Sequence, residues 1–261
     1  MYAFDIERPT SVADAVAALK DEDALALGGG QTLIPTLKQR LAAPSKLVLL
    51  TGIADLQGIA NDGDTLRIGG TTTHATVAAD TAGSYPALAD LASHIGDPAV
   101  RNRGTIGGSL ANNDPSACYP AVALASGATI ITNARAIAAD DYFQGMFETA
   151  LDDGEIVTAV SIPVPEKANY QKFVQPASRF ALVGVFVAKF AGGVRVAVTG
   201  ASNEGVYRWT QAEAALTADF SAAAIAGLSV DADNLIADVH GSAEYRAHLV
   251  KVMTGRAVTA A

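Results

Sequence analysis

The sequence predicts an α+β fold made of two small mixed subdomains and a smaller C-terminal domain of antiparallel sheet and helices. Helix and strand patterns alternate through the first two-thirds of the 261 residues, and a Pro-rich stretch at 163–165 then interrupts them. Hairpin patterns and Ala-rich helices fill the remainder. This order of elements is typical of α+β architecture. The predicted boundaries are 1–57, 58–165 and 166–261.

In the first subdomain, we expect helices and strands to alternate. Ser11 is predicted to cap a helix whose apolar side is Val12, Ala15, Val16 and Leu19. A strand over 24–27 leads into a glycine-rich loop. A second helix should then place Leu33, Ile34, Leu37 and Leu41 on one face, before a buried strand over 46–50.

The second subdomain is predicted to begin where Gly, Asn and Asp gather around residues 58–64. It should contain strands over 65–69, 128–132, 136–139 and 156–162, and a helix over 86–94. Asp114 and Pro115 are interpreted as N-cap and N1 of a helix that runs to Gly127. In the C-terminal domain we expect a hairpin of 180–190 and 194–200, and a last helix over 243–258.

Composition and charge exclude several classes of protein. Half of the residues are hydrophobic and 17% are charged, which is typical of a globular chain. The net charge is −9 and no basic cluster is visible, so nucleic acid is not an expected partner. A single cysteine, Cys118, excludes an internal disulfide and a cysteine-ligated zinc or iron–sulfur site in this chain. Without a signal-peptide pattern or a long apolar run, we expect a cytoplasmic protein without a membrane span.

The first glycine-rich loop is Gly28-Gly29-Gly30-Gln31-Thr32, between a predicted strand and a predicted helix. Successive glycines let the backbone approach a ligand closely, and the N–H groups at a helix start attract anions. Gln31 and Thr32 could add side-chain donors. An ordinary tight strand-to-helix turn is the alternative.

The second loop, Thr105-Ile106-Gly107-Gly108-Ser109, follows the same logic and could equally be a bulge or a turn. Taken together, two such loops predict facing nests of N–H donors that could hold a diphosphate without Lys or Arg. Neither loop has the spacing of a P-loop or of a Rossmann fingerprint.

Other reactive side chains give weaker signals. The four histidines, at 74, 94, 240 and 248, are scattered without metal-ligand spacing, and His74 is the one best placed to line a site. No catalytic triad or nucleophile elbow is visible. Cys118 is interpreted as a small buried residue, with a reactive thiol as the alternative. Lys172 could offer a cation to a ligand.

The sequences around the two loops resemble the FAD-binding medium subunits of molybdenum hydroxylases, the xanthine dehydrogenase and carbon monoxide dehydrogenase family. The resemblance rests on Gly-Gly-Gly-Gln-Thr-Leu-Ile-Pro at 28–35 and on the segment 96–115, which ends Ser-Leu-Ala-Asn-Asn-Asp-Pro. It extends over the chain through Asp-Tyr-Phe-Gln-Gly at 141–145, Ile-Pro-Val-Pro at 162–165 and Ser-Ala-Glu-Tyr-Arg at 242–246.

The resemblance implies a p-cresol methylhydroxylase-type FAD-binding fold, in which 1–57 and 58–165 are the FAD-binding subdomains. It implies that both loops wrap the FAD diphosphate and that a lysine in the strand after the linker approaches the cofactor. The matching positions are Gly28, Gly29, Gly30, Gln31, Thr32, Leu33, Thr105, Gly107, Gly108, Ser109 and Lys172, with Asp114 nearby.

Three positions depart from the family pattern. Ser109 stands where many relatives have Asn, and Cys118 where relatives often have an Asp near the cofactor's hydroxyl groups. A thiol is a weak acceptor, so that hydrogen bond is in question. Phe180 falls at a Tyr that packs beside the isoalloxazine in carbon monoxide dehydrogenase, and it keeps the ring without the hydroxyl.

The implied function is electron transfer by an FAD subunit with no catalytic side chain and no metal of its own. Electrons would come from a [2Fe-2S] small subunit, and a large subunit with the molybdenum cofactor would oxidise the substrate in a heterotrimer. NAD, O₂ or a quinone-linked carrier would accept the electrons. The alternatives are a self-sufficient FAD-dependent oxidase of the same fold and a non-redox nucleotide-binding or assembly protein. Only about 95 residues follow the linker, which is short for an oxidase's substrate domain.

Overall fold

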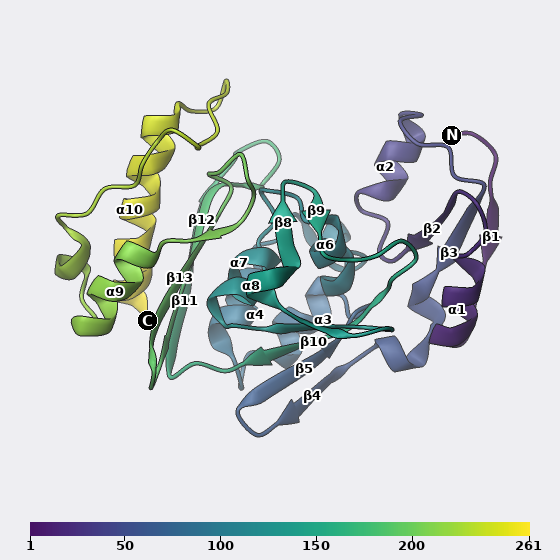
Figure 1. Ribbon diagram of the computed structural model, residues 1–261, viewed down its shortest axis with the longest axis horizontal. Coiled ribbons are helices and arrows are strands. Elements are labelled where there is room, and N and C mark those ends of the chain that lie inside the picture. Colours follow the sequence, from purple (N-terminus) through teal and green to yellow (C-terminus); the bar gives the residue numbers. More distant parts are fainter.

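The computed structural model describes all 261 residues and shows three larger sheets arranged along one long axis, with a small two-stranded sheet beside them (Figure 1). The first sheet is parallel, with strand order β1-β3-β2. Helix α1 packs on β3, and Ser11 caps that helix by accepting a hydrogen bond from the Asp14 N–H, as expected. The elements of this part are β1 (Asp5–Glu7), α1 (Val12–Ala18), β2 (Ala24–Leu27), α2 (Leu33–Lys38) and β3 (Lys46–Leu49).

The second sheet is antiparallel, with strand order β4-β5-β10-β6-β7. Helices α3, α4, α6 and α7 lie beside it in Figure 1. Its elements are β4 (Ile59–Asp62), β5 (Thr65–Gly69), α3 (His74–Asp80), α4 (Pro86–Ser93), α5 (Pro98–Arg101), α6 (Ile106–Asn112), α7 (Tyr119–Ala125), β6 (Thr129–Thr132), β7 (Ala136–Ala138), α8 (Ala139–Tyr142), β8 (Phe143–Gly145), β9 (Glu148–Thr149) and β10 (Val157–Pro163). Strands β8 and β9 form a separate small hairpin.

The third sheet, β11-β12-β13-β14, is antiparallel and is covered on both faces. Helices α9 and α10 pack on it from the C-terminal part, and α4 and α7 pack on it from the second subdomain. Because both faces are covered, eight consecutive residues of β12 are buried. The elements are β11 (Lys167–Val174), β12 (Ala181–Phe190), β13 (Gly193–Thr199), β14 (Tyr207–Arg208), α9 (Thr210–Ala218) and α10 (Ala243–Ala260).

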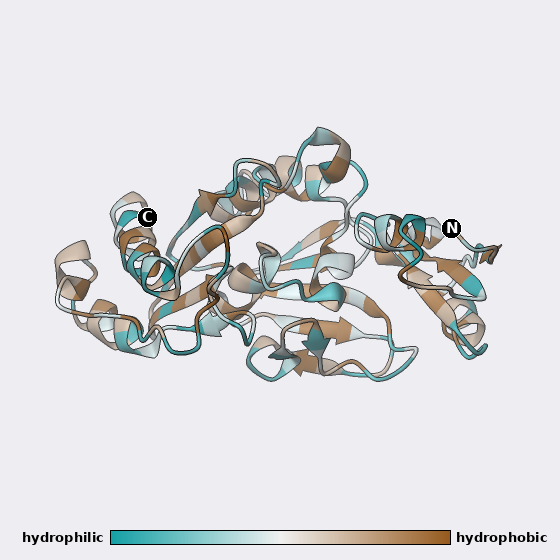
Figure 2. Ribbon diagram, turned by 90° about the horizontal axis from the view of Figure 1, so that it is seen from above, coloured by the Kyte–Doolittle hydropathy of each residue, from teal (hydrophilic) through white to brown (hydrophobic).

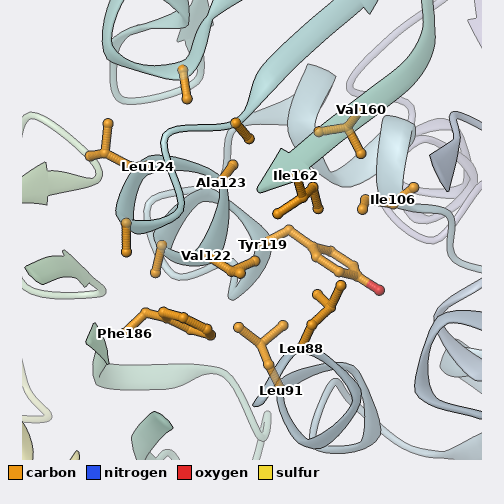
Figure 3. Close-up of a cluster of buried hydrophobic side chains, with 14 of the residues drawn as sticks. Leu88, Leu91, Ile106, Tyr119, Val122, Ala123, Leu124, Val160, Ile162 and Phe186 are labelled. Atoms are coloured by element: carbon orange, nitrogen blue, oxygen red, sulfur yellow. The ribbon is translucent and has the colours of Figure 1, made fainter. Parts of the chain in front are cut away.

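The largest hydrophobic core crosses the sequence boundary at 165. Tyr119 and Ile106 of the second subdomain share this core with Phe186 of β12 (Figure 3). A second core lies between β12, β13 and the C-terminal helices, and a small one lies beneath α1. In Figure 2 the hydrophobic colour concentrates on the strands of all three sheets, while the connecting loops are mostly hydrophilic. The third sheet is therefore held by contacts with both neighbouring layers.

Two predicted helix boundaries are wrong. Helix α2 ends at Lys38, because Arg40 adopts the left-handed region (φ 61°) and Leu41 is 74% exposed. The helix predicted from Asp114 begins at Tyr119, since the Asp114 carboxylate accepts a hydrogen bond from the Ser116 N–H and forms a turn. Helices α3, α5 and α6 and strand β4 were not anticipated, because they are short and polar or rich in glycine.

Candidate functional site

The two glycine-rich loops lie against each other, although about 75 residues separate them in the sequence. The first (residues 28–33, loop 1) joins β2 to α2, and the second (residues 104–109, loop 2) leads into α6. A Cβ atom built on Gly29 would lie 2.0 Å from the Arg103 carbonyl oxygen, and one on Gly28 would lie 3.1 Å from Thr105 Oγ1. Only glycine permits backbones to approach so closely. Gly29 therefore serves contact between the loops rather than direct approach of a ligand.

Loop 1 presents a run of unpaired donors. None of the backbone N–H groups from Gly28 to Leu33 donates to an acceptor in the protein. The Gln31 side chain folds back and donates from Nε2 to the Gly29 carbonyl (3.0 Å), while the Thr32 hydroxyl makes no capping bond. Gly30 takes φ 71°, a left-handed conformation that glycine adopts readily and that occurs in anion-binding backbone turns. These groups are half-buried or exposed and are available to an anion.

Loop 2 uses its donors within the protein, contrary to the expectation of two equivalent nests. The Ile106 and Gly107 N–H groups donate to the Thr72 and Gly70 carbonyls (3.1 and 2.8 Å). The Gly108 and Ser109 N–H groups donate to Thr105, the N-cap of α6. A Cβ atom on Gly107 would lie 2.5 Å from the Gly70 oxygen, so this glycine also serves packing. Gly108 is exposed and Ser109 half-buried at the loop surface.

His74 supports loop 2 by a backbone hydrogen bond and by packing of its ring at Gly104. Its backbone N–H donates to the Gly104 carbonyl (3.0 Å), and a Cβ atom on Gly104 would lie 2.4 Å from His74 Nε2. The ring also lies 5.2 Å from the Tyr119 ring, centre to centre. Burial, and then the Arg101 charge, lower the pKa of His74 to about 4. The imidazole is thus neutral near pH 7 and packs under the loop, with Nδ1 buried and unpartnered.

Asp114 and Cys118 lie beyond the other end of α6. That helix has seven residues, so it separates Asp114 from Thr105 by about 10 Å. Burial raises the pKa of Asp114, while its hydrogen bond from the Ser116 N–H lowers it. Cys118 is 5% exposed and its side chain belongs to the largest core, as expected of a small buried residue.

Lys172 and Phe180 belong to the third sheet. The Lys172 ammonium group donates to the His94 carbonyl at the C-terminal end of α4 (2.9 Å), a favourable position for a cation. Phe180 immediately precedes β12 and is 46% exposed. The start of β12 lies beside the segment after Asp114, because Gly200 contacts both Ala181 and Pro115. The predicted residues at 28–33 and 105–109 thus form one group, Asp114, Cys118 and Phe180 lie beyond the far end of α6, and Lys172 lies at the end of α4.

Several residues that hold loop 2 and the segment after Asp114 in place were not predicted from the sequence. Gly70 and Thr72, which accept the loop 2 hydrogen bonds, lie in an unremarkable threonine-rich stretch. Thr199 and Gly200, which contact Pro115, come from a strand end. No group of three or more His, Cys, Asp or Glu side chains is placed to hold a metal ion, and none of the helices is long and apolar enough to cross a bilayer.

Comparison with known proteins shows which family this chain resembles along its length. Residues 2–165 match the family described as the FAD binding domain in molybdopterin dehydrogenase. The chain is 37% identical to the carbon monoxide dehydrogenase medium chain of Afipia carboxidovorans, covering 98% of this chain and 96% of that one. It is 35% identical to the nicotine 6-hydroxylase medium subunit of Paenarthrobacter nicotinovorans, with 97% and 95% covered.

Solved structures agree over the whole chain. The Cu,Mo-CO dehydrogenase gives a TM-score of 0.86 at 34% identity, covering 99% of this chain and 98% of that chain. Quinoline 2-oxidoreductase from Pseudomonas putida 86 gives a TM-score of 0.87 at 31% identity, with 99% and 96% covered. The α+β fold predicted from the sequence is confirmed.

Proposed function

The chain belongs to the family of FAD-binding domains in molybdopterin dehydrogenases, and from that membership we propose that it is the FAD-carrying electron-transfer subunit of a molybdenum hydroxylase. Its relatives are named as medium chains or as subunits of dehydrogenases, so it is one chain of a multi-subunit oxidoreductase. FAD is its cofactor. The proposal concerns where FAD binds and which way electrons pass.

The run of free N–H groups in loop 1 is the observation that supports FAD binding at this place. A diphosphate has about two negative charges, and converging backbone donors can stabilise it without a cationic side chain. Gly28 to Leu33 supply six such donors. Arg103 and Gly104 pack against Gly29 and Thr105 packs against Gly28, and these contacts hold loop 1 in shape. Gly107, Gly108 and Ser109 form the first turn of α6 behind Thr105. The residues present therefore fit the diphosphate.

The predicted residues beyond the far end of α6 would meet the rest of the cofactor. FAD is much longer than a diphosphate, so a group about one helix length away is within its reach. Asp114 is a half-buried carboxylate and can accept a hydrogen bond from a cofactor hydroxyl or N–H group. Phe180 offers an exposed ring, and the Lys172 ammonium group donates to the carbonyl at the end of α4. Cys118 would act only through its backbone, since its thiol faces the core.

The proposed direction of electron flow, from an iron–sulfur partner to an external acceptor, is supported by what the chain contains and lacks. FAD held here would supply a group able to exchange electrons singly or in pairs, which suits a junction between an iron–sulfur donor and a two-electron acceptor. With one buried cysteine, this chain cannot hold a cysteine-ligated cluster itself. The metal cofactors belong to a [2Fe-2S] small subunit and a molybdenum large subunit. The protein's own task is to bind, orient and shield the flavin.

A self-sufficient oxidase would need a substrate pocket in the C-terminal part. The third sheet is packed on one face by α10 and on the other by α4 and α7, which leaves its faces filled by the protein. The structure therefore favours the electron-transfer subunit over the oxidase.

Purification of the complex from its native source tests the proposal. We expect the chain to be yellow, with one FAD per chain, and to be accompanied by molybdenum-containing and iron–sulfur subunits. Substrate should reduce the flavin only when those partners are present. A chain that copurifies with neither metal, or that turns over a substrate alone with O₂, would contradict the proposal. A colourless chain that does not take up FAD would point to a non-redox role.

A further inference from the structure

Thr199, at the end of β13, is bonded to a segment that is 84 positions earlier in the sequence. Its hydroxyl lies within donating distance of the Pro115 and Ala117 carbonyls (2.9 and 2.7 Å). The side chain is fully buried, so these bonds are shielded from water. Thr199 thus joins the third sheet to the segment 114–118, which follows α6.

The next residue, Gly200, adds a backbone bond to the same segment. Its N–H donates to the Pro115 carbonyl at 2.7 Å. Gly200 takes φ 82°, and a Cβ atom there would lie 2.5 Å from the Ala181 carbonyl oxygen. Only glycine fits this turn, which brings the segment 114–118 and the start of β12 together.

Arg246 of α10 secures the turn from the opposite side. It is 3% exposed, and its Nη1 group donates to the Leu182 and Gly200 carbonyls, each at 2.8 Å. Its Nη2 group pairs with Asp238 at 2.8 Å. A buried guanidinium is costly unless it is hydrogen-bonded, and here two carbonyls and one carboxylate accept from Nη1 and Nη2 and offset much of that cost, while Nε is buried without a partner.

We propose that Thr199 and Arg246 are positioning residues that hold the segment 114–118 and Phe180 in register with the cofactor. This proposal rests on the proposed function, because it concerns the same FAD site. Asp114 begins the segment bonded by Thr199, and Phe180 is two residues before Leu182, which Arg246 bonds. The C-terminal domain therefore does more than cover the sheet: it sets the distance between two groups that would face the flavin half of FAD.

The substitution Thr199→Val tests the proposal with little change of shape. Valine keeps the volume and removes the hydroxyl, so the Ala117 carbonyl loses its donor. We expect amide exchange of residues 116–118 in the FAD-free complex to become about tenfold faster, and the FAD dissociation constant to rise about tenfold.

Thr254→Val is the matched control. Thr254 is equally buried in the same domain, but its hydroxyl donates to the Val250 carbonyl within α10. Both variants should lose a similar amount of unfolding free energy, while only Thr199→Val should change exchange at 116–118 and FAD affinity. Equal effects of the two variants on FAD, or unchanged exchange at 116–118 in Thr199→Val, would overturn the proposal.

The variant Arg246→Lys separates positioning from folding. Lysine keeps the charge but cannot donate to Gly200, Leu182 and Asp238 together. We expect a folded complex in which the flavin absorption spectrum shifts and FAD dissociates faster. A variant with the native flavin spectrum and dissociation rate would contradict the role of Arg246. If the wild-type complex bound no FAD, the proposed function would fail. The exchange measurement would still decide whether Thr199 and Arg246 order residues 114–118.

Discussion

Loop 1 and loop 2 look equivalent in the sequence but differ in how their backbone donors are used. From Gly28 to Leu33, no N–H group has an acceptor in the protein. From Ile106 to Ser109, every N–H group has one, supplied by Gly70, Thr72 or Thr105. Both loops precede a helix, so position alone does not explain the difference.

The difference lies in what surrounds each loop. Loop 2 is inserted between His74 and the Gly70 turn, where neighbouring backbone satisfies its donors. Loop 1 follows β2, an edge strand of the first sheet, and touches loop 2 at Gly28 and Gly29. Buried donors must find partners, whereas donors at a surface can remain open for a ligand. A glycine-rich loop therefore indicates that another group approaches its backbone closely. Only the structure shows whether that group is another part of the protein or can be a ligand.

The largest expected effect is the loss of stability at low pH, which tests whether the neutral His74 ring supports loop 2. The folded-state pKa of His74 is about 4 against 6.5 for an unperturbed histidine, so the unfolded chain binds the proton more readily. Stability from the neutral ring is complete above the unfolded pKa and is lost as pH falls from 6.5 towards 4. Relative to His74→Gln, the wild type should lose up to about 3 kcal/mol over this interval in urea unfolding. Parallel pH curves for the two proteins would show that loop 2 does not rest on a neutral imidazole.

The substitution Gly107→Ala should act on stability. The new methyl group would collide with the Gly70 carbonyl, which is backbone and cannot move aside, and we expect a loss of about 2 kcal/mol in unfolding free energy. Gly255→Ala is the control, because Gly255 is also helical and its nearest neighbour, the Ala222 Cβ, is 3.9 Å away. There the same change should stabilise by roughly 0.5–1 kcal/mol. Changes of the same sign in both variants would contradict the packing role of Gly107.

The substitution Gln31→Glu should act on FAD and leave stability nearly unchanged. Gln31 is exposed, and a carboxylate there would repel a diphosphate held by loop 1, raising the dissociation constant about tenfold at low salt. Added salt should reduce the effect. Gln57→Glu introduces the same charge at another exposed glutamine that bonds a backbone carbonyl, and should leave FAD affinity near that of the wild type. Equal weakening by both variants would remove loop 1 from the phosphate site.

Local features of the fold could be predicted from the sequence because local rules determine them. Ser11 caps its helix, and strands 24–27 and 65–69 have the predicted bounds. The helix after Asp114 was predicted four residues too early, because Asp followed by Pro can form a turn as readily as a cap. Family and cofactor came from the resemblance, which the comparisons confirm.

The non-local features could not be predicted. The partners of the Ile106 and Gly107 N–H groups lie about 35 residues upstream, and Thr199 bonds carbonyls more than 80 residues away. No local pattern encodes such pairings, since backbone carbonyls are the same in every residue. For the same reason, the contrast between an open and a satisfied loop becomes visible only in three dimensions.

The central claim is that loop 1 donates to the FAD diphosphate while loop 2 holds loop 1 in shape. Amide chemical shifts of the ¹⁵N-labelled chain, recorded as FAD is added, test it most directly. Because a hydrogen bond to phosphate moves an amide proton strongly downfield, the largest shifts should fall on residues 28–33, with smaller shifts at 106–109. Riboflavin, which lacks phosphate, should leave residues 28–33 almost unmoved. Largest shifts at 106–109, or equal shifts of loop 1 with riboflavin, would contradict the account.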